Sequence, residues 1–124
     1  MQIIDSNIII YASRPEYDFL RVLIEKNIPF VSIISKIEVL GYHQLKKQEK
    51  ELLEVFFRNS PIIGLTDEIV NLSIELRQKQ NLSLADSIIA STALLNELEL
   101  VTRNTADFAR IPKLKLLNPF KGNH

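Results

Sequence analysis

Four acidic residues stand where an apolar run of the sequence ends or where a helix is expected to begin. They are Asp5, Glu38, Asp86 and Asp107. A carboxylate in such a place can bind a metal ion, transfer a proton, or only accept hydrogen bonds from the first N–H groups of a helix. The elements around these residues decide between catalytic chemistry and a purely structural role.

Three of the four acids fit the structural role, because each follows a serine or an asparagine by three residues. The pairs are Ser35 and Glu38, Ser83 and Asp86, and Asn104 and Asp107. This is the spacing of a capping box, in which the acid reaches back to the residue that begins the helix. Ser13 and Glu16 have the same spacing with no other sign of a site. The spacing alone therefore does not establish a function.

Two of the acids are harder to explain as caps. Asp86 lies in "SLADSIIASTALLNELE", whose apolar positions surround the helix and predict that it is buried. Removing an ionised group from water costs several kcal/mol unless the group is paired or bound to a metal. Asp5 ends the apolar run "QIID" with no lysine or arginine nearby, and its structural alternative is to cap the turn "SNIIIYA".

The elements expected between these acids alternate between short apolar runs and longer segments of helical period, which predicts an α/β fold with a parallel sheet. We expect strands at residues 2–5, 30–33, 61–65, 98–102 and 114–118. We expect helices at residues 15–27, 35–44, 47–59, 66–80 and 83–99. The loops after parallel strands meet at one edge of the sheet, so the four acids should gather there. Carboxylates that crowd together repel one another, and Mg²⁺ or Mn²⁺ would relieve the repulsion and support phosphodiester chemistry.

Length and composition limit the class of protein. A chain of 124 residues fits a single domain spanning 1–124, with one hydrophobic core. The formal net charge of zero provides no strong field for a polyanion, so a nucleic acid would have to be bound locally. The N-terminal apolar run is too short for a signal peptide, and no run approaches the length of a membrane span. We therefore expect a cytoplasmic protein with no membrane association.

Five stretches of the chain, taken in order, resemble the motifs of PIN-domain ribonucleases, especially the VapC-type toxins of prokaryotic type II toxin–antitoxin systems. They are "IIDSNIIIY", "SIISKIEVLGY", "LADSIIASTALL", "LVTRNTADF" and "LKLLNPF", and together they span nearly the whole chain. The resemblance implies a PIN-like fold, with a central parallel sheet of four to five strands flanked by helices. It also implies a metal-dependent endoribonuclease that cleaves single-stranded or looped RNA with Mg²⁺ or Mn²⁺.

The resemblance also implies roles for individual residues. Asp5, Glu38, Asp86 and Asp107 match the acidic quartet of the family. On this interpretation Asp5, Asp86 and Asp107 bind the metal, and Glu38 completes the metal shell or orients the attacking water. Neither His43 nor the C-terminal His124 is placed to act as a base.

Four neighbouring polar residues complete the predicted site. Asn7 and Thr102 match the auxiliary polar positions of the family, and Asn104 matches its loop asparagine. Arg103 adjoins the acidic loop, and we expect it to contact an RNA phosphate.

Partners are implied by the resemblance alone: RNA as substrate, a cognate antitoxin and a second copy of the chain in a homodimer. The helix at 47–59 carries two apolar pairs that could either form an antitoxin surface or pack in the core. They are Leu52 with Leu53 and Phe56 with Phe57.

Three alternatives remain open at this point. The chain could be a housekeeping PIN nuclease in RNA processing, or a non-catalytic binding module with the same fold. A phosphatase of the haloacid-dehalogenase type also begins with a strand that ends in aspartate, but its chemistry needs a second aspartate where this chain has Asn7.

Overall fold

A five-stranded parallel sheet forms the centre of the computed structural model, which describes residues 1–121. The strands are β1 (Gln2–Ile4), β2 (Phe30–Ser32), β3 (Ile62–Ile63), β4 (Glu99–Val101) and β5 (Leu116–Leu117). Their order is β3-β2-β1-β4-β5, and every neighbouring pair is parallel. The α/β fold predicted from the sequence is confirmed, with strands shorter than the apolar runs that indicated them.

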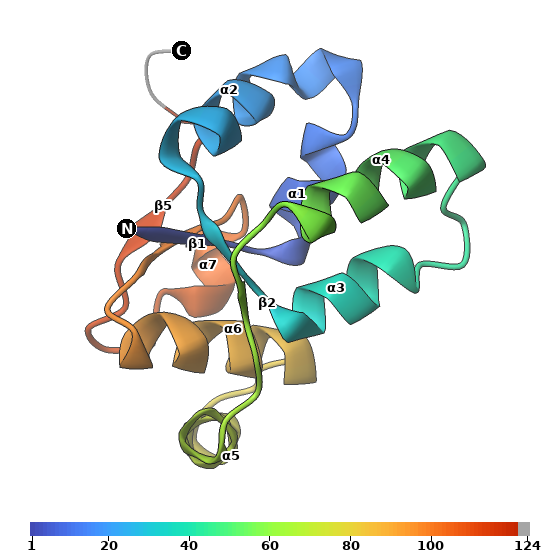
Figure 1. Ribbon diagram of the computed structural model, residues 1–124. Coiled ribbons are helices and arrows are strands. Elements are labelled where there is room, and N and C mark those ends of the chain that lie inside the picture. Colours follow the sequence, from blue (N-terminus) through green and yellow to red (C-terminus); the bar gives the residue numbers. More distant parts are fainter. Residues whose placement is uncertain (122–124) are drawn as a thin grey trace.

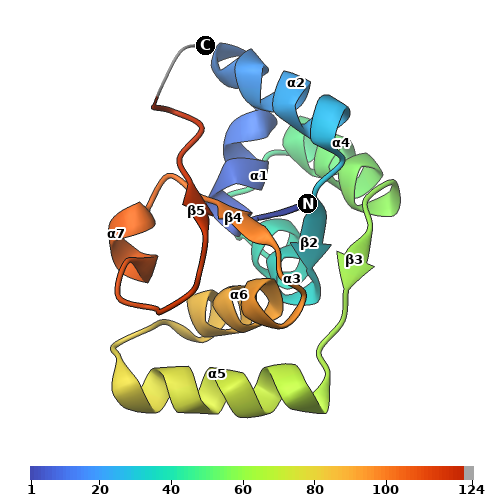
Figure 2. The ribbon, with the colours of Figure 1, turned by 90° about the vertical axis from the view of Figure 1, so that its left-hand side faces the viewer.

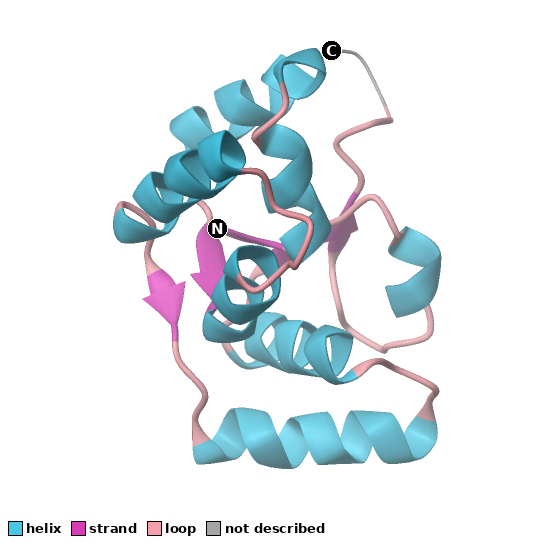
Figure 3. Cartoon of the chain, turned by 90° about the vertical axis from the view of Figure 1, so that its right-hand side faces the viewer, coloured by secondary structure: helices cyan, strands magenta, loops and turns pink. Residues whose placement is uncertain are grey.

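Helices cover both faces of this sheet (Figures 1 and 2). They are α1 (Ser6–Ala12), α2 (Asp18–Asn27), α3 (Ile33–Leu40), α4 (Lys47–Arg58), α5 (Asp67–Lys79), α6 (Leu84–Leu95) and α7 (Thr105–Phe108), with a 3₁₀ turn at Pro15–Tyr17. Helices α1, α2 and α4 lie over one face, and α5 and α6 lie over the other (Figures 2 and 3). The central strand β1 is therefore buried on both sides.

The alternation of side chains along the strands divides the core in two. Ile3 and Leu100 are fully buried in the cluster that includes residues of α5, α6 and α7. Ile4, Val31 and Val101 are fully buried in the cluster formed with α1, α2, α3 and α4. Successive residues of a strand point to opposite faces, so a continuous apolar run is what a strand covered on both faces requires. The carboxyl end of β1 is thereby fixed between two packed layers.

Three helix starts differ from the sequence prediction. The helix expected at 15–27 begins with the 3₁₀ turn, so α2 starts at Asp18. The other two differences lie beside the predicted site. Residues 6–12, expected to be a turn, form helix α1 directly after β1, because the Asp5 side chain accepts a hydrogen bond from the Ile8 N–H at 3.0 Å. Helix α3 begins at Ile33 rather than at residue 35, because Ser32 is its N-cap and accepts from the Ile34 N–H at 3.2 Å.

The early start of α3 corrects one interpretation. Ser35 lies inside the helix and is buried, so Ser35 and Glu38 do not form a capping box. Glu38 instead lies on the last turns of α3, and its position there needs another explanation. Among residues 1–121, no helix has the length and apolar character needed to cross a membrane.

Candidate active site

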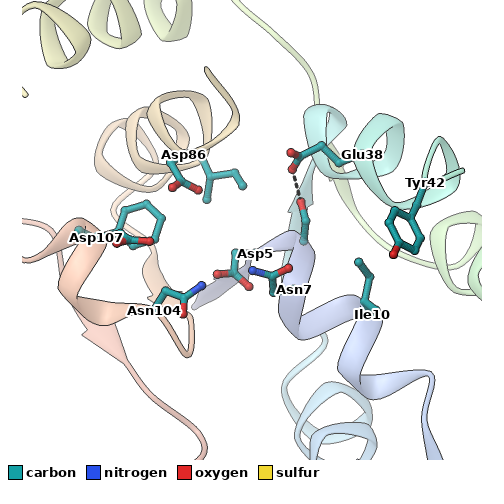
Figure 4. A pocket seen from close by; sticks show the side chains of 11 residues that line it. Asp5, Asn7, Ile10, Glu38, Tyr42, Asp86, Asn104 and Asp107 are labelled. Atoms are coloured by element: carbon teal, nitrogen blue, oxygen red, sulfur yellow. Dashed lines mark hydrogen bonds between the residues drawn. The ribbon is translucent and has the colours of Figure 1, made fainter. Parts of the chain in front are cut away.

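A cavity of about 340 Å³ opens beside the carboxyl end of β1, and all four predicted acids line it (Figure 4). Each acid comes from a different place in the fold: Asp5 from the end of β1, Glu38 from α3, Asp86 from α6 and Asp107 from α7. The other lining residues are Ser6, Asn7, Ile10, Tyr42, Ile89, Asn104 and Phe108. The structure therefore brings together carboxylates that are up to 102 residues apart, between Asp5 and Asp107, in the sequence.

Asp5 is the most buried of the four acids, with 5% of its surface exposed. Burial raises the pKa of its carboxyl group, hydrogen bonds from the Thr102 side chain and the Ile8 and Asn7 N–H groups lower it, and the charge of Glu38 raises it. The net result is a raised pKa. Asp5 is therefore both the N-cap of α1 and a carboxylate whose ionised form the fold disfavours.

Asp86 lies in the first turn of α6, where Ser83 is the N-cap and accepts a hydrogen bond from the Asp86 N–H at 3.1 Å. Burial is the largest cause that raises the pKa of Asp86, and hydrogen bonding with the Ser83 side chain opposes it. The charges of Asp107, Asp5 and Glu38 raise the pKa further. Asp86 is thus close enough to each of the other three acids for their charges to repel its own.

Glu38 is solvent-exposed, and a contact with α1 fixes its side chain in the cavity. The Ser6 hydroxyl donates to a Glu38 carboxylate oxygen at 2.6 Å, the bond drawn in Figure 4, and it is hydrogen-bonded to the Ser35 hydroxyl at 3.0 Å. Ser6 immediately follows Asp5, so the start of α1 positions both Asp5 and Glu38. The sequence predicted only a capping role for Ser35 and no role for Ser6, although both serines lie within the acidic motifs.

Asp107 is exposed on the short helix α7, which Phe108 anchors by burying its ring in the core. The Asp107 N–H donates to the Asn104 carbonyl at 3.1 Å, whereas the Asn104 side chain forms no cap hydrogen bond. Instead, Asn104 lines the cavity, and Figure 4 shows it and Asn7 on either side of Asp5. Both asparagines predicted as auxiliary residues therefore lie at the cavity.

Thr102, the third auxiliary residue, is fully buried directly after β4. Its hydroxyl oxygen accepts from the Asn104 N–H at 3.0 Å, and its side chain hydrogen-bonds to Asp5. Thr102 thus joins the loop that carries Asn104 to the buried acid.

The rim of the cavity includes two residues for which the sequence gave no signal, Ile10 and Tyr42. Tyr42 follows Gly41, where a Cβ atom would lie 2.5 Å from the Ile37 carbonyl oxygen. The absence of a side chain lets the chain leave α3 at this point and carry Tyr42 to the rim. His43, whose ring lies 5.4 Å from that of Tyr42, does not line the cavity, and His124 lies outside the described residues.

The donor set fits a hard divalent cation, because it consists of four carboxylates and two side-chain amides, with no lysine or arginine among the lining residues within 1–121. In the part of the chain that the structure describes, no group of three acidic or histidine side chains is already arranged to hold an ion. Such a cation commonly keeps several of its waters, so carboxylates can hold it without all contacting it directly.

Arg103 lies outside this cavity. Its guanidinium group packs over the Phe120 ring, 4.2 Å from the ring centre, and lies 5.4 Å from the centre of the Tyr11 ring. It lines a neighbouring hollow that shares Asn104 and Asp107 with the acidic cavity. Arg103, which the sequence predicts to contact an RNA phosphate, therefore lies beside the acids rather than among them.

This fold, with acids gathered at the ends of its central strands, is that of a PIN domain, and the family model for the PIN domain matches residues 3–114. The chain belongs to the PIN-domain family. Within the family its relatives include ribonuclease VapC2 of Rickettsia felis, which is 32% identical and is aligned over 93% of this chain and 95% of the relative. The family match supports the resemblance seen in the sequence and gives no support to the phosphatase alternative.

Solved structures extend the comparison to whole chains. A chain in a toxin–antitoxin complex from Klebsiella pneumoniae is 32% identical, with a TM-score of 0.77 over 98% of this chain and 100% of that one. A chain in the crystal structure of VapBC2 from Rickettsia felis bound to a DNA fragment from its promoter is 28% identical. Its TM-score is 0.77, over 94% of this chain and 97% of that one. The similarity thus covers the elements that carry all four acids.

Proposed function

We propose that this chain is a metal-dependent endoribonuclease and the toxin of a toxin–antitoxin pair. The observation that carries the proposal is the cavity that Asp5, Glu38, Asp86 and Asp107 line together, where the other three acids repel Asp86 and no basic side chain lies among the lining residues within 1–121. The family and the names of the relatives support the same function.

The proposed cofactor is Mg²⁺ or Mn²⁺. Asp5, Asp86 and Asp107 would hold the ion, directly or through water, and Glu38 would complete the set or orient the attacking water. A divalent cation at this place lowers the pKa of a coordinated water and offsets negative charge on the phosphate. In the overall reaction, water adds across a P–O bond of the RNA chain, one fragment keeps the phosphate and the other leaves with a hydroxyl group.

Cleavage of a panel of single-stranded and hairpin RNAs tests the enzyme assignment. Wild-type protein should cleave with Mg²⁺ or Mn²⁺ and not with EDTA, and Asp86→Asn should lose the activity. Glu16→Gln is the matched control, because Glu16 is an exposed acid in the 3₁₀ turn and does not line the cavity. If no RNA is cleaved with either ion, the chain is a non-catalytic binding module with the PIN fold.

Expression in bacteria tests the toxin assignment separately. Wild-type protein should arrest growth, and Asp5→Asn should not, because the carboxylate needed for cleavage is absent. A protein that cuts RNA in vitro but leaves growth unchanged at high expression would instead be a housekeeping nuclease in RNA processing.

The proposed antitoxin surface is a groove of about 380 Å³ beside helix α4. Leu53 and Phe57 are buried in the core, whereas Leu52 is 45% exposed and Phe56 is half-buried. Leu53 lies at the floor of the groove, which Leu52 and Phe56 also line, and Phe57 does not line it. Most of the residues that line the groove are apolar: Ile9, Ala12, Ile24, Leu52, Leu53, Val55 and Phe56, together with Ser13, Arg21, Glu25 and Asn59. An extended or helical antitoxin tail with apolar side chains fits this lining.

We further propose that the antitoxin sends a basic side chain into the acidic cavity. An arginine there would pair with carboxylates such as Asp5 and Asp86 that the cation also needs. Inhibition by the antitoxin should therefore weaken as Mg²⁺ is raised. Inhibition that is independent of Mg²⁺ would show that the antitoxin acts without entering the cavity.

The final part of the proposal is a homodimer. Exposed apolar side chains on α3 and α6, Ile37 and Leu84, could contribute to such an interface. Light scattering of the purified protein should give twice the monomer mass of 14.2 kDa.

A further inference from the structure

A second hollow, of about 490 Å³, adjoins the acidic cavity and shares Asn104 and Asp107 with it. Its outer wall is formed by Arg103, Asn118, Phe120 and Lys121. We propose that this hollow binds a phosphate group of the RNA strand next to the phosphate being cleaved. The inference rests on the proposed ribonuclease function. It adds to that function the place at which the RNA strand leaves the acidic cavity.

Charge is the first reason. The acidic cavity is lined by no lysine or arginine among residues 1–121, so it cannot by itself attract the neighbouring phosphates of a polyanion. Two cationic side chains, Arg103 and Lys121, line the adjoining hollow. Because the whole chain has a formal net charge of zero, local cations of this kind must supply the attraction for RNA.

The geometry of Arg103 is the second reason. The guanidinium carbon lies over the Phe120 ring, 4.2 Å from the ring centre, and this contact restricts the long side chain before any ligand binds. The ring has no acceptor for the N–H groups of the guanidinium, so these donors can still form the bidentate contact that suits a phosphate. The arrangement therefore places a phosphate-binding group in position beside Asp107.

The Phe120 ring is itself held by other aromatic rings. Tyr11, Tyr17 and Phe19 each contact it edge-on, with ring centres 5.2 to 5.6 Å apart. These three residues come from α1, the 3₁₀ turn and α2, so the ring is fixed by a different layer of the fold. We assign Phe120 as a positioning residue that acts through Arg103.

Asn118 joins the two segments that form the hollow. Its side-chain amide donates to the Arg103 carbonyl at 3.4 Å, and its side-chain oxygen accepts from the Phe120 N–H at 2.9 Å. The loop after β4 and the segment after β5 are thereby connected through one side chain. The hollow is a built feature of the fold rather than a chance gap between loops.

Binding of a fluorescein-labelled single-stranded RNA to the non-cleaving Asp86→Asn protein tests the assignment. Fluorescence anisotropy at several salt concentrations gives the Kd and its salt dependence. In this background Arg103→Gln should raise the Kd about tenfold and reduce the slope of log K against log salt by about 0.7, the contribution of one phosphate contact on a single strand. Lys26→Gln is the matched control, because it removes the same charge from α2, at a hollow that shares no residue with the acidic cavity or with the hollow of Arg103. Its Kd and slope should stay unchanged.

The Phe120→Leu variant tests whether Phe120 acts by positioning Arg103 or only by stabilising the fold. It should raise the Kd about threefold in the Asp86→Asn background and have no further effect when Arg103→Gln is already present, because the two residues act as one unit. Arg103→Lys, which keeps the charge without the planar group, should retain the salt slope and bind with an intermediate Kd. Circular dichroism of each variant checks that the fold is intact.

The inference is overturned if Arg103→Gln and Lys26→Gln give the same Kd and slope while wild-type protein still cleaves RNA. It is also overturned if Phe120→Leu weakens binding equally with and without Arg103. Absence of cleavage by wild-type protein overturns the ribonuclease proposal instead, and the binding comparison still decides whether this hollow contacts a phosphate.

Discussion

Asp5 offers the sharpest test of the site, because its side chain stabilises the fold in one way and destabilises it in another. As the N-cap of α1 it accepts the Ile8 N–H, and it also hydrogen-bonds with Thr102. As a buried charge near Glu38 it has a raised pKa, so the ionised form is disfavoured despite those hydrogen bonds. Asp5→Asn should remove only the charge, whereas Asp5→Ala should remove the cap as well.

The expected magnitudes follow from these contacts. Loss of an aspartate N-cap costs about 1 kcal/mol, whereas asparagine is an equally good cap. The buried Thr102 hydroxyl, which keeps the Asn104 N–H but loses its bond to Asp5, costs about 1 kcal/mol more. Asp5→Ala should therefore be about 2 kcal/mol less stable than Asp5→Asn, which for a chain of this length lowers Tm by about 8 °C. With EDTA at pH 7.5, Asp5→Asn should have a higher Tm than wild-type protein.

The Tm difference between Asp5→Asn and wild-type protein should depend on pH, and the raised pKa of Asp5 gives its sign. A carboxyl group with a raised folded-state pKa contributes stability that is fully present below its unfolded pKa and lost as pH rises through the folded pKa. Asp5 should therefore weaken the metal-free fold at neutral pH and not at acid pH. The Tm advantage of Asp5→Asn over wild type should shrink as pH falls, since the other carboxyl groups are common to both proteins.

Thermal unfolding followed by circular dichroism measures all three proteins from pH 3.5 to pH 7.5, with and without Mg²⁺. Addition of Mg²⁺ should raise the Tm of wild-type protein more than that of Asp5→Asn, because a ligand stabilises the state that binds it. Equal Tm values for wild type and Asp5→Asn in EDTA at pH 7.5 would refute the electrostatic reasoning. Equal Tm values for the alanine and asparagine variants would refute the capping role.

Three further predictions concern the cation, the serine beside Asp5 and helix α4. Mn²⁺ affinity measured by calorimetry should be weaker at pH 5 than at pH 7.5, because protons compete for the same carboxylates, and equal affinities would argue against a carboxylate site. Ser6→Ala should weaken both Mn²⁺ binding and RNA cleavage by releasing Glu38, whereas Ser6→Thr should retain them; unchanged Mn²⁺ affinity in the alanine variant would contradict this role. In urea unfolding, Leu53→Ala should lose about 3 kcal/mol of stability and Leu52→Ala less than about 1 kcal/mol, because only Leu53 is buried; similar losses would contradict this division of α4.

The sequence was sufficient to predict the sheet, because strands covered on both faces read as continuous apolar runs. Ile3 and Ile4 belong to opposite halves of the core, so both must be apolar. The gathering of acids also followed, since parallel strands end at one edge. The predicted strands were too long, because residues that follow a strand, such as Asp5 and Thr102, are buried like the residues of the strand itself.

Helix starts were predicted less well, because two serines three residues apart fit the same pattern. Ser32 and Ser35 can each begin a helix, and the pairing of Ser32 with Ile63 in the sheet places the start of α3 immediately after the strand. Ser83 was interpreted correctly as a cap, since no competing serine precedes it in a strand. The contact between Arg103 and the Phe120 ring could not be predicted from the sequence, because only tertiary packing brings together these two residues, which are 17 positions apart.

The structural and the metal-binding interpretations of the acids are compatible rather than opposed. Asp5 caps α1, Asp86 lies in the first turn of α6 and Asp107 lies in the first turn of α7. The start of a helix favours negative charge, and at Asp5 a backbone N–H group also binds the side chain, so these elements offset part of the repulsion among the carboxylates. Glu38 has no such support late in α3, and the Ser6 hydroxyl supplies it instead. Helix starts thus help to hold three of the acids in place without a cation. Burial first, and then the neighbouring acids, still raise the pKa of Asp5 and of Asp86, so this support is incomplete. The remaining repulsion is what a divalent cation would remove.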